Sequence, residues 1–349
     1  VGGVESHVQS VSEGLNASNE LEVICCNTEK KTVVETINNV KVTRYKSWGR
    51  LFSLPISFSF IFSFHKHSAD ILHFHLPNPL AVMAYLLNPP KGKVVITWHS
   101  DIIKQKIILF FYTPFLKLFL KKADRIITTS PNLAVNSKFL SKFQQKIAIV
   151  PLALDPSKYP PTPLANPLPK FALFVGRFIY YKGVLELIEA VKQTDITLVM
   201  IGEGPLEATI RKNGTELINE GRLKIYPFQN RTKLNAFFNA CEFFILPSIH
   251  PSEAFGIVQL EAMVYEKALI STNLPTGVPW VNKDNETGVV VEPGNIQMLS
   301  DAISKLWHHP NLRTQYGKNA HTRFMTYFTE DKLIEKTNKL FKKLSNPHD

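Results

Sequence analysis

The chain has 349 residues, with 40 Lys or Arg and 29 Asp or Glu, which gives a formal net charge of +11. One hydrophobic core rarely grows to this length, so we expect two domains. Hydrophobic residues make up 44% of the sequence, as in a globular protein. The three cysteines (Cys25, Cys26 and Cys241) exclude a disulfide framework and a paired-cysteine zinc site, which fits a reducing compartment.

The chain opens with VGGVESHV and shows no signal-peptide pattern. Gly2 and Gly3 precede a helix-like segment. A βα unit has its strand just before such a turn, so we expect a first strand ahead of Val1. The longest apolar stretch, residues 51–64, spans 14 residues with a proline and four serines, fewer than the ~20 of a membrane-spanning helix. These features predict a soluble or peripheral protein.

Short β-branched and aromatic runs alternate with longer amphipathic segments along the whole chain. Nearly continuous apolarity over about five residues is typical of strands that are buried on both faces of a parallel sheet. The pattern predicts an α/β fold with two Rossmann-like domains and strands at residues 21–26, 71–75, 94–98, 125–129, 146–150, 171–175, 197–201, 243–246 and 268–271.

Six prolines in residues 156–169 indicate a connector between the two domains, because proline fits neither kind of regular element. We expect an N-terminal domain at 1–165, a C-terminal domain at 166–328, and a helix and tail at 329–349. Ligands of open α/β sheets bind at the carboxyl ends of the strands, so the cleft between the two domains is the expected site.

Positive charge is concentrated in the first half, where residues 1–168 carry a net +9 and the remainder +2. Residues 104–125 interleave cations with aromatic and aliphatic side chains, which suits an anionic membrane surface. An ordinary helix with a core face and a solvated face is the alternative, and no recognisable module supports nucleic acid. The candidate membrane or acceptor cations are Lys104, Lys106, Lys117, Lys121 and Lys122.

Glu253 and Glu261 lie eight positions apart in PSEAFGIVQLEAM. If a helix begins near Phe255, the pair is roughly 12 Å apart, too far for the acid and base of a glycoside hydrolase. The amides of Phe255 and Gly256 would instead open a helix whose N-terminus suits a phosphate. We expect a phosphorylated sugar there, with Glu253 near its hydroxyls and Glu261 near a ribose. Two solvated glutamates on a surface helix are the alternative.

The segment EAFGIVQLE resembles the E-x7-E motif of the retaining GT-B glycosyltransferases, in particular glycosyltransferase family 4. In that family the first Glu contacts the donor sugar and the second contacts the ribose. Arg177 and Lys182 of FVGRFIYYKG match the basic pair that holds the donor diphosphate, although a basic pair in a loop is often only solvated. Fixed cations of this kind would stabilise the charge of a diphosphate leaving group.

Two further patterns bear on the cofactor. IGEGP at residues 201–205 follows a strand as in the family, but without a complete G-x-G-x-x-G it does not indicate a dinucleotide dehydrogenase. The chain contains no D-x-D, which predicts a metal-independent mechanism with no cofactor beyond the donor.

His99 and Asp101 follow the apolar run VVITW, where active-site residues of doubly wound sheets tend to lie. In the family a His at this place contacts the donor sugar, and Gly3 belongs to a glycine loop beside the donor phosphates. A histidine satisfied at a strand end is the alternative. The string TWHSDIIKQK resembles bacterial mannosyl- and rhamnosyltransferases of O-antigen and capsule assembly.

The resemblance implies a GT-B fold whose C-terminal helix crosses back to the first domain. It implies transfer of a hexose from a nucleotide diphosphate sugar, with GDP preferred and UDP next, to a lipid-linked saccharide. The enzyme would act in the cytoplasm at the inner face of the plasma membrane. A sugar-nucleotide epimerase and a non-catalytic sugar-binding protein are the alternatives. Residues 273–282 lack the double glycine and Glu of many members, so this motif does not identify the donor sugar.

Overall fold

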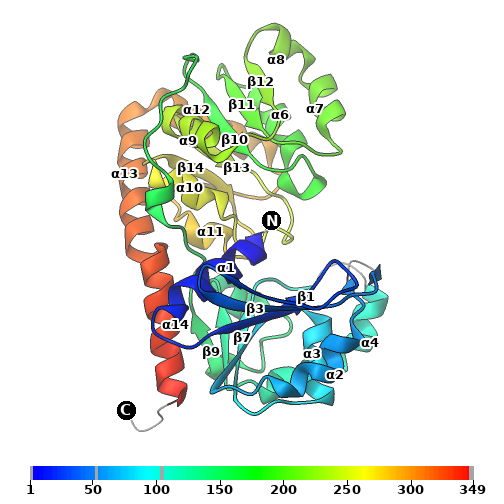
Figure 1. Cartoon of the computed structure of the whole chain (residues 1–349). Coiled ribbons are helices and arrows are strands. Elements are labelled where there is room, and N and C mark those ends of the chain that lie inside the picture. Colours follow the sequence, from blue (N-terminus) through cyan, green and yellow to red (C-terminus); the bar gives the residue numbers. More distant parts are fainter. Residues whose placement is uncertain (1–2, 52–53, 103–105, 346–349) are drawn as a thin grey trace. The chain divides into compact units, whose positions relative to one another are not determined.

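A computed structural model describes residues 3–51, 54–102 and 106–345. The chain forms two compact units (Figure 1). Unit 1 comprises Val1–Pro151 together with Glu330–Asp349, and unit 2 comprises Leu152–Thr329. The proline-rich connector therefore enters unit 2, where Tyr159, Leu164 and Leu168 pack against a hydrophobic core. The division comes at Pro151, before the expected boundary at residue 165.

The main sheet of unit 1 is parallel, in the order β6-β7-β8-β9. Apolar side chains such as Ile96 and Trp98 are fully buried in it, as strands covered on both faces require. Its strands are β6 (Ile71–Leu76), β7 (Lys93–Trp98), β8 (Arg125–Thr128) and β9 (Ile147–Ile149).

A second sheet of unit 1 contains a hairpin that the sequence analysis missed. Strand β3 pairs in parallel with β1 and antiparallel with β2, so this sheet is mixed. Asn38 and Asn39 have φ of +49° and +66°, and two such residues form the tight turn that suits the twist of a hairpin. The strands are β1 (Glu22–Cys26), β2 (Val33–Ile37) and β3 (Val40–Tyr45), with a separate ribbon of β4 (Arg50–Leu51) and β5 (Leu54–Pro55).

Helices cover the sheets of unit 1. Two of them begin at a side-chain cap followed by proline: Asn78 accepts from the Ala81 amide, and Ser130 accepts from the Leu133 amide. The last helix, α14, returns to this unit and packs along α1, with Ile334 against Gly14 (Figure 1). The helices are α1 (Gly3–Asn16), α2 (Phe58–Ser63), α3 (Pro79–Leu87), α4 (Lys106–Lys122), α5 (Pro131–Asn136) and α14 (Glu330–Ser345).

Unit 2 is built on one six-stranded parallel sheet, in the order β12-β11-β10-β13-β14-β15. Counted from β10, this is the order 3-2-1-4-5-6 of a doubly wound dinucleotide-binding fold. The chain reverses direction across the sheet between β10 and β13, and ligands bind at such a switch point. The strands are β10 (Ala172–Val175), β11 (Leu198–Ile201), β12 (Leu223–Tyr226), β13 (Phe243–Leu246), β14 (Ala268–Thr272) and β15 (Gly288–Val291).

Two hydrophobic clusters lie on opposite faces of this sheet. Along β13, Phe243 and Ile245 belong to one cluster while Phe244 and Leu246 belong to the other, as the two-residue period of a strand requires. The helices are α6 (Val184–Lys192), α7 (Glu207–Asn213), α8 (Thr215–Asn219), α9 (Arg231–Ala240), α10 (Val258–Val264), α11 (Val278–Val281), α12 (Ile296–His308) and α13 (Pro310–Tyr327).

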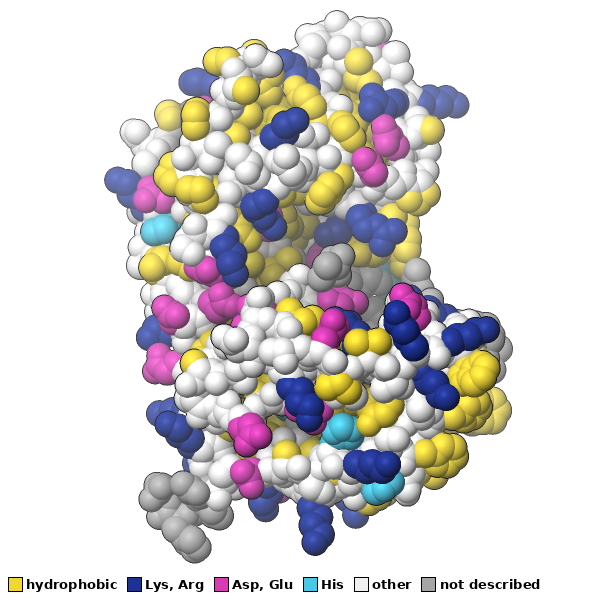
Figure 2. All heavy atoms as spheres, viewed as in Figure 1, with side chains coloured by type: hydrophobic (Ala, Val, Ile, Leu, Met, Phe, Trp, Pro, Cys, Tyr) yellow, Lys and Arg dark blue, Asp and Glu magenta, His cyan; other side chains and the backbone are white. Residues whose placement is uncertain are grey.

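The exposed surface of α4 has an unusual composition. Its core face includes Phe119, which is fully buried, but Phe110 and Phe111 are 75% and 68% exposed. Figure 2 shows hydrophobic side chains beside Lys and Arg on the side of unit 1 that carries α3 and α4 in Figure 1. Despite this apolar surface, none of the helices among the described residues is both long and apolar enough to cross a membrane.

Candidate active site

Two loops meet at the switch point of unit 2. The loop after β10 carries Arg177 and Lys182, and the loop after β13 carries Glu253. Gly183, which follows Lys182 in the first loop, has φ of +65° and lies against Pro247 of the second loop. A Cβ added to Gly183 would lie 1.9 Å from the Pro247 carbonyl oxygen. Only glycine allows this approach, which holds Lys182 close to the second loop.

Lys182 and Glu253 form an ion pair, with Nζ 2.5 Å from Oε2. Both side chains are only 12% exposed, so water screens the pair weakly. The Ser248 hydroxyl donates a second hydrogen bond to the same carboxylate oxygen, at 3.1 Å. Glu253 is therefore held in place by two donors, one of them charged.

Arg177 extends the positive charge of this site. Its side chain is exposed, and no carboxylate within the described residues pairs with it. Burial raises the pKa of the neighbouring Tyr181, while the charges of Lys182 and Arg177 act in the opposite direction. The loop thus presents one paired cation and one unpaired cation, a combination that can receive a diphosphate.

The E-x7-E segment differs from the expected helix in one respect. Helix α10 begins at Val258 rather than near Phe255, because Gly256 has a left-handed φ of +71° that no residue of an α-helix adopts. The Phe255 ring is buried against Trp280. In the described part of the chain, the amides of Phe255 and Gly256 donate to no protein acceptor, so they are available to a ligand.

Glu261 lies inside unit 2 and has protein partners. Arg231 Nη1 is 2.7 Å from its Oε1, and the Tyr159 hydroxyl donates to the same oxygen at 3.3 Å. Burial raises the pKa of Glu261, and the charge of Arg231 opposes that rise. The contact of Glu261 with a ribose stays a prediction, and a ligand would meet it together with Arg231.

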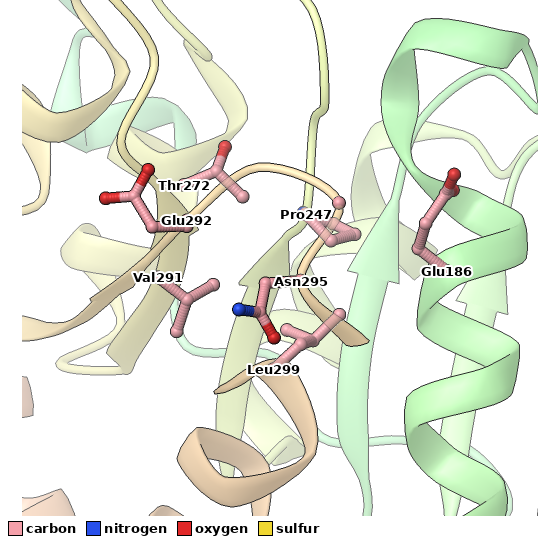
Figure 3. A pocket seen from close by; sticks show the side chains of 8 residues that line it. Glu186, Pro247, Thr272, Val291, Glu292, Asn295 and Leu299 are labelled. Atoms are coloured by element: carbon pink, nitrogen blue, oxygen red, sulfur yellow. The ribbon is translucent and has the colours of Figure 1, made fainter. Parts of the chain in front are cut away.

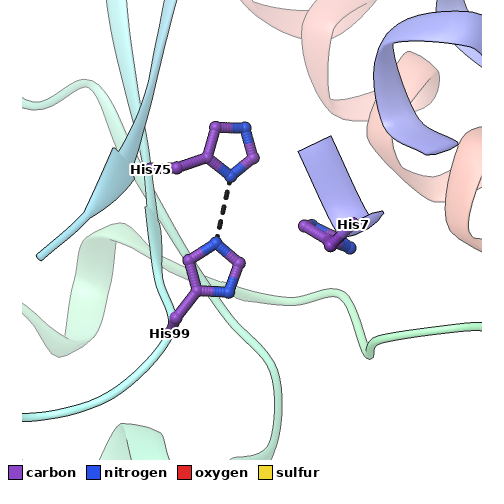
Figure 4. Close-up of side chains that lie close together, drawn as sticks. All are labelled: His7, His75 and His99. Atoms are coloured by element: carbon purple, nitrogen blue, oxygen red, sulfur yellow. Dashed lines mark hydrogen bonds between the residues drawn. The ribbon is translucent and has the colours of Figure 1, made fainter. Parts of the chain in front are cut away.

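In unit 1, His99 belongs to a cluster of three histidines (Figure 4). His99 follows β7, His75 lies on β6 and His7 lies on α1. His75 Nδ1 is 3.0 Å from His99 Nε2, and the His7 ring meets the His99 ring edge-on at 5.2 Å between centroids. Because Nε2 of His99 faces His75, Nδ1 is the nitrogen that a donor sugar could contact.

Burial keeps these rings neutral. It lowers the pKa of His7 to about 4 and that of His99 to about 3, and the pKa of His75 also lies well below its usual value. His73, two residues before His75 on the same face of β6, is hydrogen-bonded to Thr97 Oγ1 at 2.7 Å. The cluster therefore offers uncharged donors and acceptors, unlike the site of unit 2.

The other predicted residues of unit 1 have different environments. The carboxylate of Asp101 accepts from Trp98 Nε1, Ser137 Oγ and the Lys138 amide, so it ties its own loop to α5 and the residues that follow. Gly3 is the first residue of α1. Lys104 and the side chain of Lys106 lie outside the described residues, and the exposed lysines are Lys117, Lys121 and Lys122.

Comparison with known proteins identifies the family. Residues 1–158 match the model of Glycosyltransferase Family 4, and residues 158–323 match that of Glycosyl transferases group 1. The O-antigen chain mannosyltransferase C of Escherichia coli is 31% identical over 96% of this chain and 92% of its own. The chain belongs to glycosyltransferase family 4.

Another relative of this glycosyltransferase is D-rhamnosyltransferase WbpZ of Pseudomonas aeruginosa, which is 31% identical over 94% of this chain and 89% of the relative. Sucrose-phosphate synthase from Thermosynechococcus elongatus has a TM-score of 0.78 at 20% identity, over 99% of this chain and 94% of that one. Anabaena Alr3699/HepE in complex with UDP and glucose has a TM-score of 0.72 at 16% identity, over 98% and 96%. These likenesses confirm the GT-B fold.

A small pocket of the glycosyltransferase adjoins the second loop at Pro247 (Figure 3). Glu186, Pro247, Thr272 and Asn295 are among its lining residues. It has room for about one water molecule, far less than a nucleotide sugar needs. We therefore assign the site to the open loops at the switch point and not to this pocket.

The segment that departs from the family motif packs against the E-x7-E segment. The Gly277 amide donates to the Ala254 carbonyl at 2.8 Å, and a Cβ on Gly277 would lie 2.7 Å from the Phe255 ring. Residues 273–282 thus adjoin the loop of Glu253, where a change in sequence can alter which sugar fits.

Sequence reasoning missed five residues around the sites. Arg231 and Ser248 hold the two motif glutamates but carry no local pattern of their own. His75 could have been found, because the alternation ILHFHL places His73 and His75 on one face of a strand. The full set is His7, His75, Tyr159, Arg231 and Ser248.

Proposed function

We propose that this glycosyltransferase moves a hexose, with mannose preferred, from a GDP-sugar to a hydroxyl of a lipid-linked saccharide. Retention of anomeric configuration and independence of metal belong to the proposal, and UDP is the next candidate nucleotide. The observation that carries it is the Lys182–Glu253 pair beside Arg177, at the point where a doubly wound sheet binds phosphates. The mannosyl- and rhamnosyltransferase relatives support the donor and the acceptor class.

The proposed reaction breaks the bond between the anomeric carbon and the diphosphate oxygen and forms a bond to the acceptor oxygen. Negative charge grows on the diphosphate, and Arg177, Lys182 and the amide of Gly256 stabilise it. Such fixed donors typically contribute a factor of about 10²–10³ each. The acceptor proton passes to the leaving phosphate as both bonds change on the same face of the sugar.

Glu253 orients the sugar in this scheme and forms no covalent bond with it. Its carboxylate is held by Lys182 and Ser248, which suits a fixed hydrogen-bond acceptor better than a nucleophile. His99 contributes a neutral hydrogen bond to the same sugar.

The test is turnover of a radiolabelled nucleotide sugar with and without a lipid-linked acceptor. GDP, UDP and dTDP are first compared by thermal shift, where a ligand at 100 times its Kd stabilises the fold by about 2.7 kcal/mol. We expect transfer only with acceptor, with unchanged anomeric configuration by NMR and undiminished rate in EDTA. Isomerised sugar in the absence of acceptor would indicate an epimerase. Binding without turnover would indicate a non-catalytic sugar-binding protein. Rescue of an EDTA-treated enzyme by Mg²⁺ would show a metal requirement.

We further propose that α4 places the enzyme on the anionic inner face of the plasma membrane. Phe110, Phe111 and Phe115 are exposed on a helix whose last turn carries Lys121 and Lys122. Exposed rings beside cations suit a lipid interface, where the rings enter the headgroup region and each nearby Lys contributes about 1 kcal/mol. Helices α2 and α3 add exposed Phe58, Phe62 and Leu87 to unit 1.

Vesicle co-sedimentation tests this placement. Replacing Lys117, Lys121 and Lys122 by Gln should weaken binding to anionic vesicles by about 3 kcal/mol, roughly 10²-fold, and added salt should weaken it further. The matched control replaces the exposed Lys212, Lys305 and Lys318 of unit 2, which removes the same charge. Equal pelleting of the wild type and the α4 variant at low salt would contradict the proposal. A soluble acceptor should be glycosylated normally by both variants.

A further inference from the structure

We propose that His7, His75 and His99 form a binding site for one divalent transition metal ion such as Zn²⁺, and that the bound ion inhibits sugar transfer by occupying His99. The inhibitory half of this proposal rests on the proposed function. The binding half does not.

The geometry of the cluster is close to that of a metal site. One ligand atom from each of the three rings lies within 4.8 Å of the other two. A tetrahedral ion bound at 2.0–2.1 Å holds its nitrogens about 3.4 Å apart. His75 Nδ1 and His99 Nε2 are already 3.0 Å apart, so mainly His7 has to move.

The framework around the cluster holds two of the ligands in register. The His99 amide donates to the Leu76 carbonyl at 3.0 Å, and this bond ties His99 to the strand that carries His75. His7 comes from α1, a separate element that faces both rings (Figure 4). Because the helix can adjust against the sheet, the third ligand can approach without breaking a strand.

The chemistry of the donor set selects the ion. Three imidazoles without a carboxylate suit Zn²⁺, Cu²⁺ and Ni²⁺ and disfavour Mg²⁺ and Ca²⁺, which prefer oxygen. Three protein ligands leave a fourth position for water. His7 and His99 are mostly buried and His75 is partly exposed, so an ion can enter beside His75.

Occupation of this site has a consequence for the reaction. In the proposed mechanism the nitrogen of His99 that does not face His75 contacts the donor sugar. An ion bound to Nε2 fixes the orientation of the His99 ring, so the ring can no longer rotate freely to contact the sugar. We therefore expect Zn²⁺ to inhibit an enzyme that needs no metal for its chemistry.

Direct binding is the first test, on the full chain stripped with EDTA. We expect Co²⁺ to produce visible ligand-field absorption that saturates at one ion per chain, and Zn²⁺ to displace it. His7→Gln and His75→Gln should each lower the affinity at least tenfold. The matched control is His65→Ala, because His65 is an exposed histidine of unit 1 outside the cluster. Absence of saturable binding, or equal affinity in all four proteins, would overturn the site.

Circular dichroism before metal addition checks that each variant is folded. If His75→Gln is unfolded, the metal affinity of His7→Gln alone tests the site, because a helix residue can be replaced without disturbing a strand. In the activity arm, one equivalent of Zn²⁺ should inhibit the wild type and His65→Ala reversibly and His7→Gln far less. Equal inhibition of all three would refute the inhibitory half. Should no protein turn over, the proposed function fails while the absorption data still decide the metal site.

Discussion

The loops after β10 and β13 in unit 2 and the histidine cluster in unit 1 both lie at the carboxyl ends of parallel strands, but their charges differ. In unit 2 a buried Lys182–Glu253 pair is joined by an exposed Arg177. In unit 1, burial keeps His7, His75 and His99 neutral. In the proposed mechanism, unit 2 stabilises the charge that develops in the reaction, and unit 1 orients the sugar with uncharged groups.

The largest expected effect concerns the cations of unit 2. Lys182→Ala and Arg177→Ala should each reduce kcat by about 10² or more, since each removes a fixed donor from the leaving diphosphate. Arg211→Ala, an exposed cation of α7 paired with Glu207, is the control and should leave kcat unchanged. Near-normal rates in both site variants would place the diphosphate elsewhere.

The neutral cluster should respond less. His99→Ala should reduce kcat/KM by about fivefold, because a neutral hydrogen bond contributes about 1 kcal/mol net. Steady-state kinetics on the same donor and acceptor as for Lys182→Ala gives a direct comparison. A loss as large as that of Lys182→Ala would mean that unit 1 also stabilises charge, and the contrast between the units would fail.

Comparison of two glycine variants separates the steric effect of the close approach at Gly183 from the effect of backbone strain alone. Gly183→Ala should destabilise unit 2 by more than Gly221→Ala, although both glycines have φ near +70°. A Cβ at Gly221 meets nothing within 4 Å, so only the strain of about 1–2 kcal/mol applies there. Urea unfolding measures the difference, and equal losses would show that the Pro247 loop moves aside without cost.

The smallest expected effect concerns the pH dependence of stability at Glu261. The pKa of Glu261 is raised, so its carboxylate binds a proton more tightly in the folded state than in the unfolded chain. This contribution to stability is present below the unfolded pKa and is lost as pH rises through the folded pKa. Between pH 7 and pH 5 the thermal midpoint of the wild type should therefore fall less, or rise more, than that of Glu261→Gln. The control is Glu207→Gln, a partly exposed surface glutamate of α7, and it should follow the wild type.

Four of the six strands of unit 2 were predictable because their local composition determines them. Runs such as FFIL and ALIST contain only residues that tolerate burial on both faces, and the structure has β13 and β14 there. Less apolar strands were missed: β12 reads LKIY and β15 begins with Gly288. Their place in the sheet is set by neighbouring strands more than by their own residues.

Residue types in motifs were predictable, but their pairing was not. Lys182 and Glu253 were both named from the sequence, yet nothing local indicates that they form an ion pair across 71 positions of chain. Helix α10 was predicted three residues too early, because a glycine after Phe255 is compatible with a helix until its φ is known. The histidine cluster required three elements to converge, which only the tertiary structure provides.

The return of α14 to unit 1 has a consequence for the order of folding during synthesis. Unit 2 is complete once Thr329 has been made, and Leu154 and Thr329 at its two ends already pair in a β-bridge. Unit 1 begins before unit 2 but lacks Leu333 and Thr337, both buried residues of α14, until unit 2 has been made. The domain that starts later can therefore finish earlier, and the surface of unit 1 that α14 covers stays exposed until α14 has been made.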